Sequence, residues 1–114
     1  LTTLSAQLGA AGHFVFTLAP QAPACLTESR MFCPALGIPE DPVSGNAHGI
    51  LGAYLAQHGL LQRDGDAARF TGVQGQSLHR PGAVDVELEW KDGKLDAVWI
   101  VGQAVPVFET TISL

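Results

Sequence analysis

The sequence predicts a single α+β domain, residues 1–114, in which an antiparallel β-roll or barrel wraps around one central buried α-helix. Three observations support this fold class. Residues 46–58 are apolar around nearly the whole helical circumference, which is typical of a buried helix. Most of the remaining segments have the composition of strands. A chain of 114 residues with 46% hydrophobic residues can bury one core without metal or disulfide support.

The elements before this helix are a short helical turn and two strands. Residues 4–8 predict a turn of helix that ends at a glycine. Residues 13–18, HFVFTL, predict a strand, and residues 24–32, ACLTESRMF, predict a second one with looser alternation. Each of these strands ends shortly before a proline, which cannot donate a hydrogen bond to a sheet.

The predicted central helix contains glycines at positions that have structural consequences. Gly49 and Gly52 would let strand side chains approach the helix axis closely. Gly59 follows the last helical residue, where a left-handed cap is expected. A sheet wrapped around the helix is the simplest arrangement, and a plain two-layer packing of a sheet on the helix is the alternative.

The elements after the helix are all strands. Residues 68–75 predict one strand, and residues 83–90, AVDVELEW, alternate cleanly between apolar and acidic side chains. Residues 91–94, KDGK, contain the Asp-Gly pair of a tight hairpin and lead into a strand at 95–102. Residues 103–114 predict a last strand, in which a proline indicates an edge position or a bulge. These segments together predict an antiparallel meander.

Composition excludes several classes of partner. The net charge is −5, and six Lys and Arg are spread thinly along the chain, so we expect no binding to nucleic acid. No apolar run approaches the ~18 residues that a membrane-spanning helix needs, and the first residues do not resemble an export signal. Cys25 and Cys33 lack the spacing of a metal site and are expected to be reduced thiols. We therefore expect a cytoplasmic protein, although a chain that begins with Leu1 can be a piece of a longer one.

A polar turn, EDPVSGN, directly precedes the apolar helix. The first amides of a helix have no partner within it and carry partial positive charge. Ser44 or Asn46 can cap them, which is the ordinary structural interpretation. Gly45 has no side chain, so a carboxylate or phosphate can also approach the amides of Gly45, Asn46 and Ala47. Asp41 would lie within one turn of such an anion, where a carboxyl group suits a general acid or base.

This stretch also resembles a known family signature. EDPVSGNAHG is similar to the pattern E-D-P-[AV]-[TS]-G-[SN]-A of the C-terminal half of the phenazine-biosynthesis-like isomerases, the PhzF family, which is related in fold to diaminopimelate epimerase. SRMFCPALGIPEDP, VQGQSLHRPGAVDVELE and WIVGQAVPVFE resemble the flanking segments of that family in the same order. The resemblance covers residues 12–109.

The resemblance implies two similar halves, each a β-roll around a central helix, with an active site where the two helix N-termini meet. It implies an isomerase that works without cofactor or metal and moves a proton on a small carboxylate-bearing substrate. Asp41 matches the family's aspartate that assists proton transfer. Ser44, Gly45, Asn46 and Ala47 match the residues that bind the substrate, with Asn46 in the place of a serine.

Further expectations concern the cleft and the missing half. We expect His48 and Gln74 as candidates to line the cleft, although a hydrogen-bonded histidine at the helix start is the ordinary alternative. His79 stands where the family has a glycine. The family's general base is a glutamate of the N-terminal half, which has no counterpart here. The chain would then be a half-site completed by that half or by a second copy in a homodimer. The alternative is a non-catalytic module that binds a small acid or a protein.

Overall fold

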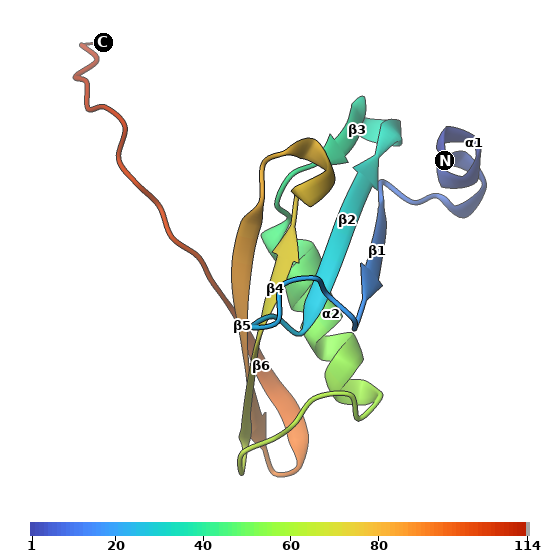
Figure 1. Cartoon of the computed structure of the whole chain (residues 1–114), viewed down its shortest axis with the longest axis vertical. Helices are drawn as coiled ribbons and strands as arrows, with labels where there is room; N and C mark the ends of the chain where they lie inside the picture. The colour runs from blue at the N-terminus through green and yellow to red at the C-terminus, as the bar shows by residue number, and fades with distance from the viewer. Residues whose placement is uncertain (114) are drawn as a thin grey trace.

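The computed structural model describes residues 1–113, which form one curved six-stranded sheet and two α-helices (Figure 1). The elements in chain order are α1 Thr2–Leu8, β1 His13–Thr17, β2 Thr27–Cys33, β3 Ile38–Asp41, α2 Gly45–Gln57, β4 Ala67–Gln74, β5 Gly82–Lys91 and β6 Lys94–Val101. The α+β class predicted from the sequence is confirmed. The short strand β3 had not been predicted.

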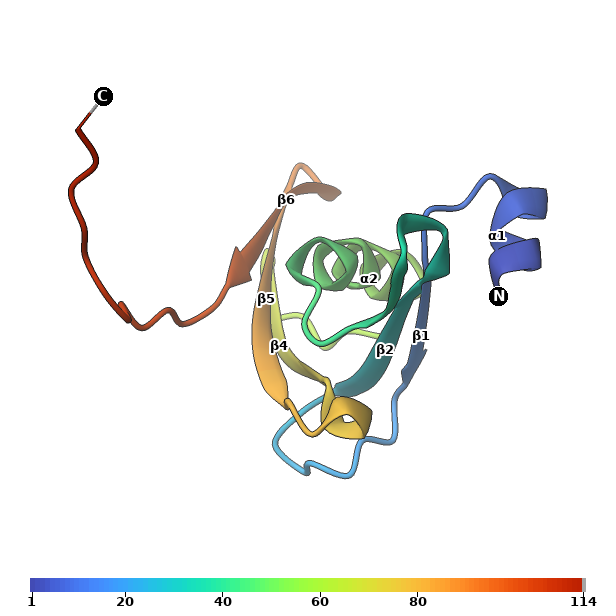
Figure 2. The same cartoon turned by 90° about the horizontal axis from the view of Figure 1, so that it is seen from above.

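The strands follow the order β1-β2-β4-β5-β6, and β3 pairs with β2. Seen from above, the sheet curls around α2 without closing into a barrel (Figure 2). All neighbours are antiparallel except β2 and β4, which run parallel over Thr27–Ser29 and Gly72–Gln74. The antiparallel prediction is therefore wrong for this one pair. The physical reason is that α2 connects the two strands as a crossover, and such a connection brings the chain back in the same direction.

The core lies between α2 and the concave face of β4 and β5. Leu51 and Leu55 of α2 pack there against buried apolar residues of the two strands, and the whole cluster is Leu51, Leu55, Ala68, Phe70, Val84, Val86 and Leu88. The predicted alternation of β5 is confirmed, because its apolar residues are buried while its acidic residues stay on the outer face. Gly52 allows this close packing, since a Cβ there would lie 2.8 Å from Val86 Cγ1.

The helix α2 stays uncovered along one side, which corrects the prediction of a helix buried all round. Leu55 is completely buried, whereas Ile50 is 73% and Tyr54 47% exposed. The edge strands β1 and β6 do not meet, so the sheet leaves one side of the helix open (Figure 2). The apolar residues around α2 correctly indicated that the helix is part of the core. How much of the helix surface is covered depends on the number of strands in the sheet.

The segment after β6 corrects a second prediction. Residues 102–113 form no strand and run away from the sheet (Figure 1). Their large apolar side chains are exposed, with Val107 at 89% and Phe108 at 83%. A strand needs a neighbour that accepts its backbone hydrogen bonds, and in residues 1–113 this segment pairs with none. The end of the predicted strand, Leu114, lies outside the described residues.

Turns and caps follow the sequence closely. Gly59 has a φ of +66°, and the amides of Gly59 and Leu60 donate to the carbonyls of Ala56 and Leu55, which is the expected left-handed helix end. Asp92 and Gly93 both have positive φ, as a two-residue hairpin requires. Both cysteines are free thiols, as expected. None of the helices described in residues 1–113 has the length and apolarity to cross a membrane.

Candidate active site at the start of α2

The candidate site is the turn that joins β3 to α2. Asp41 is the last residue of β3, and Ser44 is the N-cap of α2 with an extended backbone (φ −119°, ψ 92°). The Ser44 hydroxyl does not cap the helix. It donates to Asp41 Oδ2 at 2.5 Å, which brings two of the predicted site residues together. The capping role considered for Ser44 is therefore not present.

The first amides of α2 are available to a ligand. Among residues 1–113, no hydrogen bond reaches the amide of Gly45, Asn46 or Ala47. These residues line a surface hollow of about 440 Å³ together with Asp41, Ser44, Met31 and Val43. Partial positive charge at a helix start favours an anion at such a place. The structure thus brings the five predicted site residues from 41 to 47 around one hollow.

Gln74 does not line this hollow, contrary to the sequence-based expectation. It is the last residue of β4 and is completely buried beneath the turn. Its Nε2 donates to the Asp41 carbonyl at 2.6 Å and to Ser44 Oγ at 3.2 Å, while its Oε1 accepts from the Ser44 amide at 3.2 Å. Gln74 therefore supports the turn from inside the domain.

His48 is also buried rather than exposed in a cleft, so the alternative of a hydrogen-bonded histidine holds. Its side chain is 0% exposed, and its Nδ1 lies 2.9 Å from the Ser44 carbonyl oxygen. Because that oxygen can only accept, Nδ1 carries the proton and Nε2 faces Ser29 Oγ at 3.5 Å. Burial lowers the pKa of His48, and its hydrogen bond to Ser44 opposes this in part. The neutral imidazole is thus the form that fits.

Two glycines let the loop after β4 pack against the turn. Gly75 has a φ of +90°, and a Cβ there would lie 2.7 Å from the carbonyl oxygen of Pro42 and closer still to that of Arg80. A Cβ at Gly82 would overlap with Val43. These contacts pack the segment VQGQSLHRPG closely against EDPVSGN. Sequence reasoning missed this contact, although a Gln-Gly pair at the end of a strand is a signal for a close backbone approach.

An ion pair holds the other side of β3. Arg30 of β2 binds Glu40 with two hydrogen bonds, Nε to Oε1 at 2.9 Å and Nη2 to Oε2 at 2.8 Å. Ser77 adds a third bond to Glu40. The hydrogen bond from Arg30 lowers the pKa of Glu40. Arg30 thus pairs with Glu40 next to Asp41.

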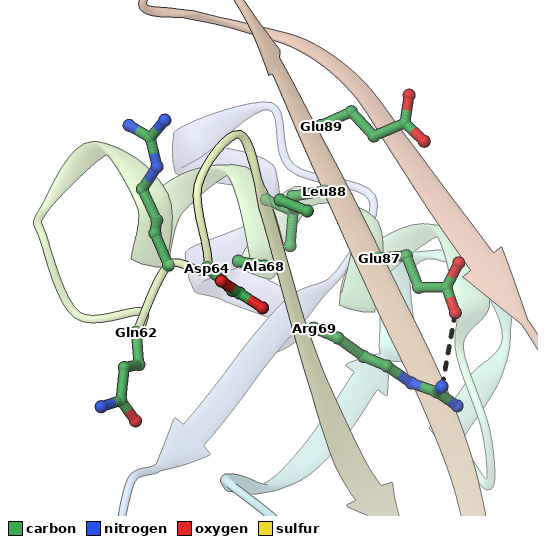
Figure 3. Close-up of a pocket in the computed structure, with 9 residues that line it drawn as sticks. Gln62, Asp64, Ala68, Arg69, Glu87, Leu88 and Glu89 are labelled. Atoms are coloured by element: carbon green, nitrogen blue, oxygen red, sulfur yellow. Dashed lines mark ion pairs between the residues drawn. The ribbon is translucent and has the colours of Figure 1, made fainter.

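Another surface hollow lies elsewhere, between the segment that leads into β4 and the strands β4 and β5 (Figure 3). It measures about 620 Å³ and is lined by Arg69, Glu87 and Leu88 among others. Arg69 pairs there with Asp85 at 2.9 Å and with Glu87 at 3.7 Å. None of the predicted site residues lines this hollow. Within residues 1–113, no three His, Cys, Asp or Glu side chains come together in a way that would hold a metal ion.

Comparison with known proteins identifies related chains. The chain matches the family described as phenazine biosynthesis-like protein over residues 2–110. It is 45% identical over 108 residues to an uncharacterized isomerase, YddE, of Salmonella typhimurium, which covers 95% of this chain. It is 34% identical over 86 residues, 75% of the chain, to trans-2,3-dihydro-3-hydroxyanthranilate isomerase of Pseudomonas chlororaphis.

A solved structure supports the fold. The crystal structure of the Bacillus anthracis phenazine biosynthesis protein of the PhzF family superposes with a TM-score of 0.69 at 23% identity and covers 88% of this chain and 38% of that one. The chain spans 36% of the length of the Salmonella relative and 30% of that of the Pseudomonas relative. By its matched residues and its fold, the chain belongs to the phenazine biosynthesis-like protein family.

Proposed function

We propose that this chain forms the C-terminal half of the active site of an isomerase or epimerase that moves a proton on a small carboxylate-bearing molecule. The observation that carries the proposal is the arrangement at the start of α2. The amides of Gly45, Asn46 and Ala47 have no hydrogen bond among residues 1–113 and share one hollow with the Asp41 carboxylate. The family relationship supports a proton-transfer reaction, because several relatives are named isomerases.

In this mechanism the helix start binds the substrate and Asp41 handles the proton. The three amides and the helix dipole hold the substrate carboxylate, which fixes the distance of the reacting carbon from Asp41. One Asp41 oxygen, Oδ2, is bound by Ser44, and Oδ1 has no hydrogen bond among residues 1–113. Oδ1 then exchanges the proton with the substrate. An isomerisation removes one proton and returns one, so the composition of the substrate is unchanged.

A second group must complete the reaction. The partner group is the glutamate base that the family resemblance places in an N-terminal half. We propose that this half, or a second copy of the chain, covers the hollow and supplies that base. The open side of α2, with Ile50 73% exposed, is consistent with a further surface that packs on this domain.

Substrate binding can be tested on the chain alone. The probe is 3-hydroxyanthranilate, an aromatic carboxylate chosen after the reaction in the name of the Pseudomonas relative. We expect its addition to shift the NMR signals of the Gly45, Asn46 and Ala47 amides. Gly45→Ala should weaken this binding without loss of stability, because a Cβ there meets only Ile100 Cγ2 at 3.4 Å. Binding that leaves the three amide signals unmoved would contradict the proposed cradle.

Catalysis needs the missing part of the protein. A chimera that joins this chain to the N-terminal part of the Pseudomonas chlororaphis isomerase can be assayed for incorporation of deuterium from D2O into the substrate. We expect Asp41→Asn to lower the rate by about 10²–10⁴-fold, the usual loss when a general acid or base is removed. Equal rates in the two chimeras would exclude the catalytic role of Asp41 and leave a binding module as the function.

A further inference from the structure

Two completely buried side chains bind every polar group of Ser44, the residue between Asp41 and the helix amides. Gln74 accepts from the Ser44 amide at 3.2 Å, and His48 Nδ1 donates to the Ser44 carbonyl at 2.9 Å. The Ser44 hydroxyl accepts from Gln74 Nε2 at 3.2 Å and donates to Asp41 at 2.5 Å. Both Gln74 and His48 are 0% exposed. Ser44 is itself half-buried, and each of its polar groups has a partner.

The network has only one consistent direction. Asp41 O can only accept and the Ser44 amide can only donate, so the Gln74 carboxamide has one allowed orientation, with Nε2 toward Asp41 O and Oε1 toward the amide. Its second N–H then donates to Ser44 Oγ. The single proton of that hydroxyl is left for the Asp41 carboxylate.

We propose that Gln74 is a positioning residue for Asp41. Gln74 acts through the Ser44 hydroxyl and keeps the Asp41 carboxylate away from the helix amides. Asp41 precedes Ser44 by three residues, and a loose carboxylate so near a helix start is attracted to the free amides and competes with a ligand for them. The Gln74–Ser44 link prevents this competition. The inference rests on the proposed function, because a positioning role matters only where Asp41 and the amides act on a bound carboxylate.

The first test needs no ligand. In the ¹⁵N-labelled chain, Gln74→Met keeps the length of the side chain but removes all three hydrogen bonds. We expect the hydrogen of the Ser44 amide to exchange with solvent about fivefold to tenfold faster. The three-bond couplings that report the χ1 angle of Asp41 should change from the values of one rotamer to an average over several rotamers. Gln57→Met, the same substitution at an exposed position of α2, should change neither. Asp41 couplings that stay the same in Gln74→Met would overturn the inference.

The second test separates positioning from a loss of structure. We expect Gln74→Met to weaken binding of 3-hydroxyanthranilate at the α2 amides about fivefold or more. In the Asp41→Asn background, which has no competing charge, the same substitution should change the affinity less than twofold. An equal loss in both backgrounds would mean that Gln74 only stabilises the turn, and it would overturn the inference.

The outcomes for the two proposals are distinguishable. If the probe fails to bind the wild-type amides, the proposed carboxylate cradle is wrong, and the Asp41 couplings still decide whether Gln74 orients Asp41.

Discussion

Two glycines on α2 provide a matched test of how closely the sheet wraps the helix. Both lie in the interior of the helix, where replacement by Ala favours the helical backbone by about 1 kcal/mol. Their surroundings differ. A Cβ at Gly49 would lie 3.3 Å from Ile100 Cδ1, the end of a side chain that is 41% exposed. A Cβ at Gly52 would lie 2.8 Å from Val86 Cγ1, which is completely buried, and 3.5 Å from Phe70 Cε1.

The expected magnitudes follow from these contacts. Ile100 can turn away into solvent, so Gly49→Ala should raise the free energy of unfolding by about 0.5–1 kcal/mol. At Gly52 the contact is roughly 1 Å shorter than an ordinary one between carbons, and Val86 cannot move without a shift of β5. Such overpacking costs about 1–3 kcal/mol, which exceeds the gain in helix propensity. Gly52→Ala should therefore lower the free energy of unfolding by about 0–2 kcal/mol.

The measurement is urea unfolding of the wild type and both variants, followed by circular dichroism at 222 nm. The two variants should differ by about 0.5–3 kcal/mol, or by roughly 4 °C in Tm for each kcal/mol. Because both changes add one methyl group to one helix, differences in helix propensity cancel in the comparison. If Gly52→Ala proved as stable as Gly49→Ala, the close packing of β5 on α2 would be refuted.

Two further predictions concern buried polar groups. Thr27 Oγ1 is buried without a hydrogen bond among residues 1–113, so Thr27→Val should raise the free energy of unfolding by about 1 kcal/mol. As a control, Ser29→Ala removes a hydrogen bond to the Val73 carbonyl at 3.2 Å. It should lower the free energy of unfolding by a similar amount. A loss of stability in Thr27→Val would contradict this. Burial lowers the pKa of His48 from 6.5, so His48 of the unfolded state binds a proton at a higher pH than His48 of the folded state. The contribution of His48 to the free energy of unfolding should therefore be constant above pH 6.5. It should fall as the pH drops below 6.5, by at most about 1.4 kcal/mol per pH unit. Urea unfolding at pH 7.5 and 5.5 measures this fall, and a His48→Gln variant with an undiminished fall would show that another group causes it.

Local signals in the sequence predicted most of the fold correctly. The alternation of β5, the Asp-Gly hairpin and the helix end at Gly59 each depend on neighbouring residues, and each is confirmed. The parallel pairing of β2 with β4 and the absence of a strand after Val101 depend on which segments meet in space. Periodicity within one segment carries no information on its neighbours.

The same distinction applies to the site. The position of Asp41 beside the first amides of α2 follows from their short separation in the sequence. Sequence separation does not predict whether His48 and Gln74 face solvent or the core. Gln74, for example, reaches the turn from β4 across the sheet. His79 is a smaller example. It replaces the glycine of the family pattern but still adopts a positive φ of 54°, as histidine does more readily than most residues.

The parallel pairing of β2 and β4 also bears on how the domain folds. The two strands meet over only three residues each, and the whole crossover between them, α2 included, must close before Gln74 can reach Ser44. Contacts that close a long loop form late and slow the folding reaction. The turn around Asp41 should therefore be among the last parts to become ordered and among the first to open. A carboxylate that binds only the closed turn would slow this opening and raise the apparent stability of the whole domain in proportion to the logarithm of its concentration.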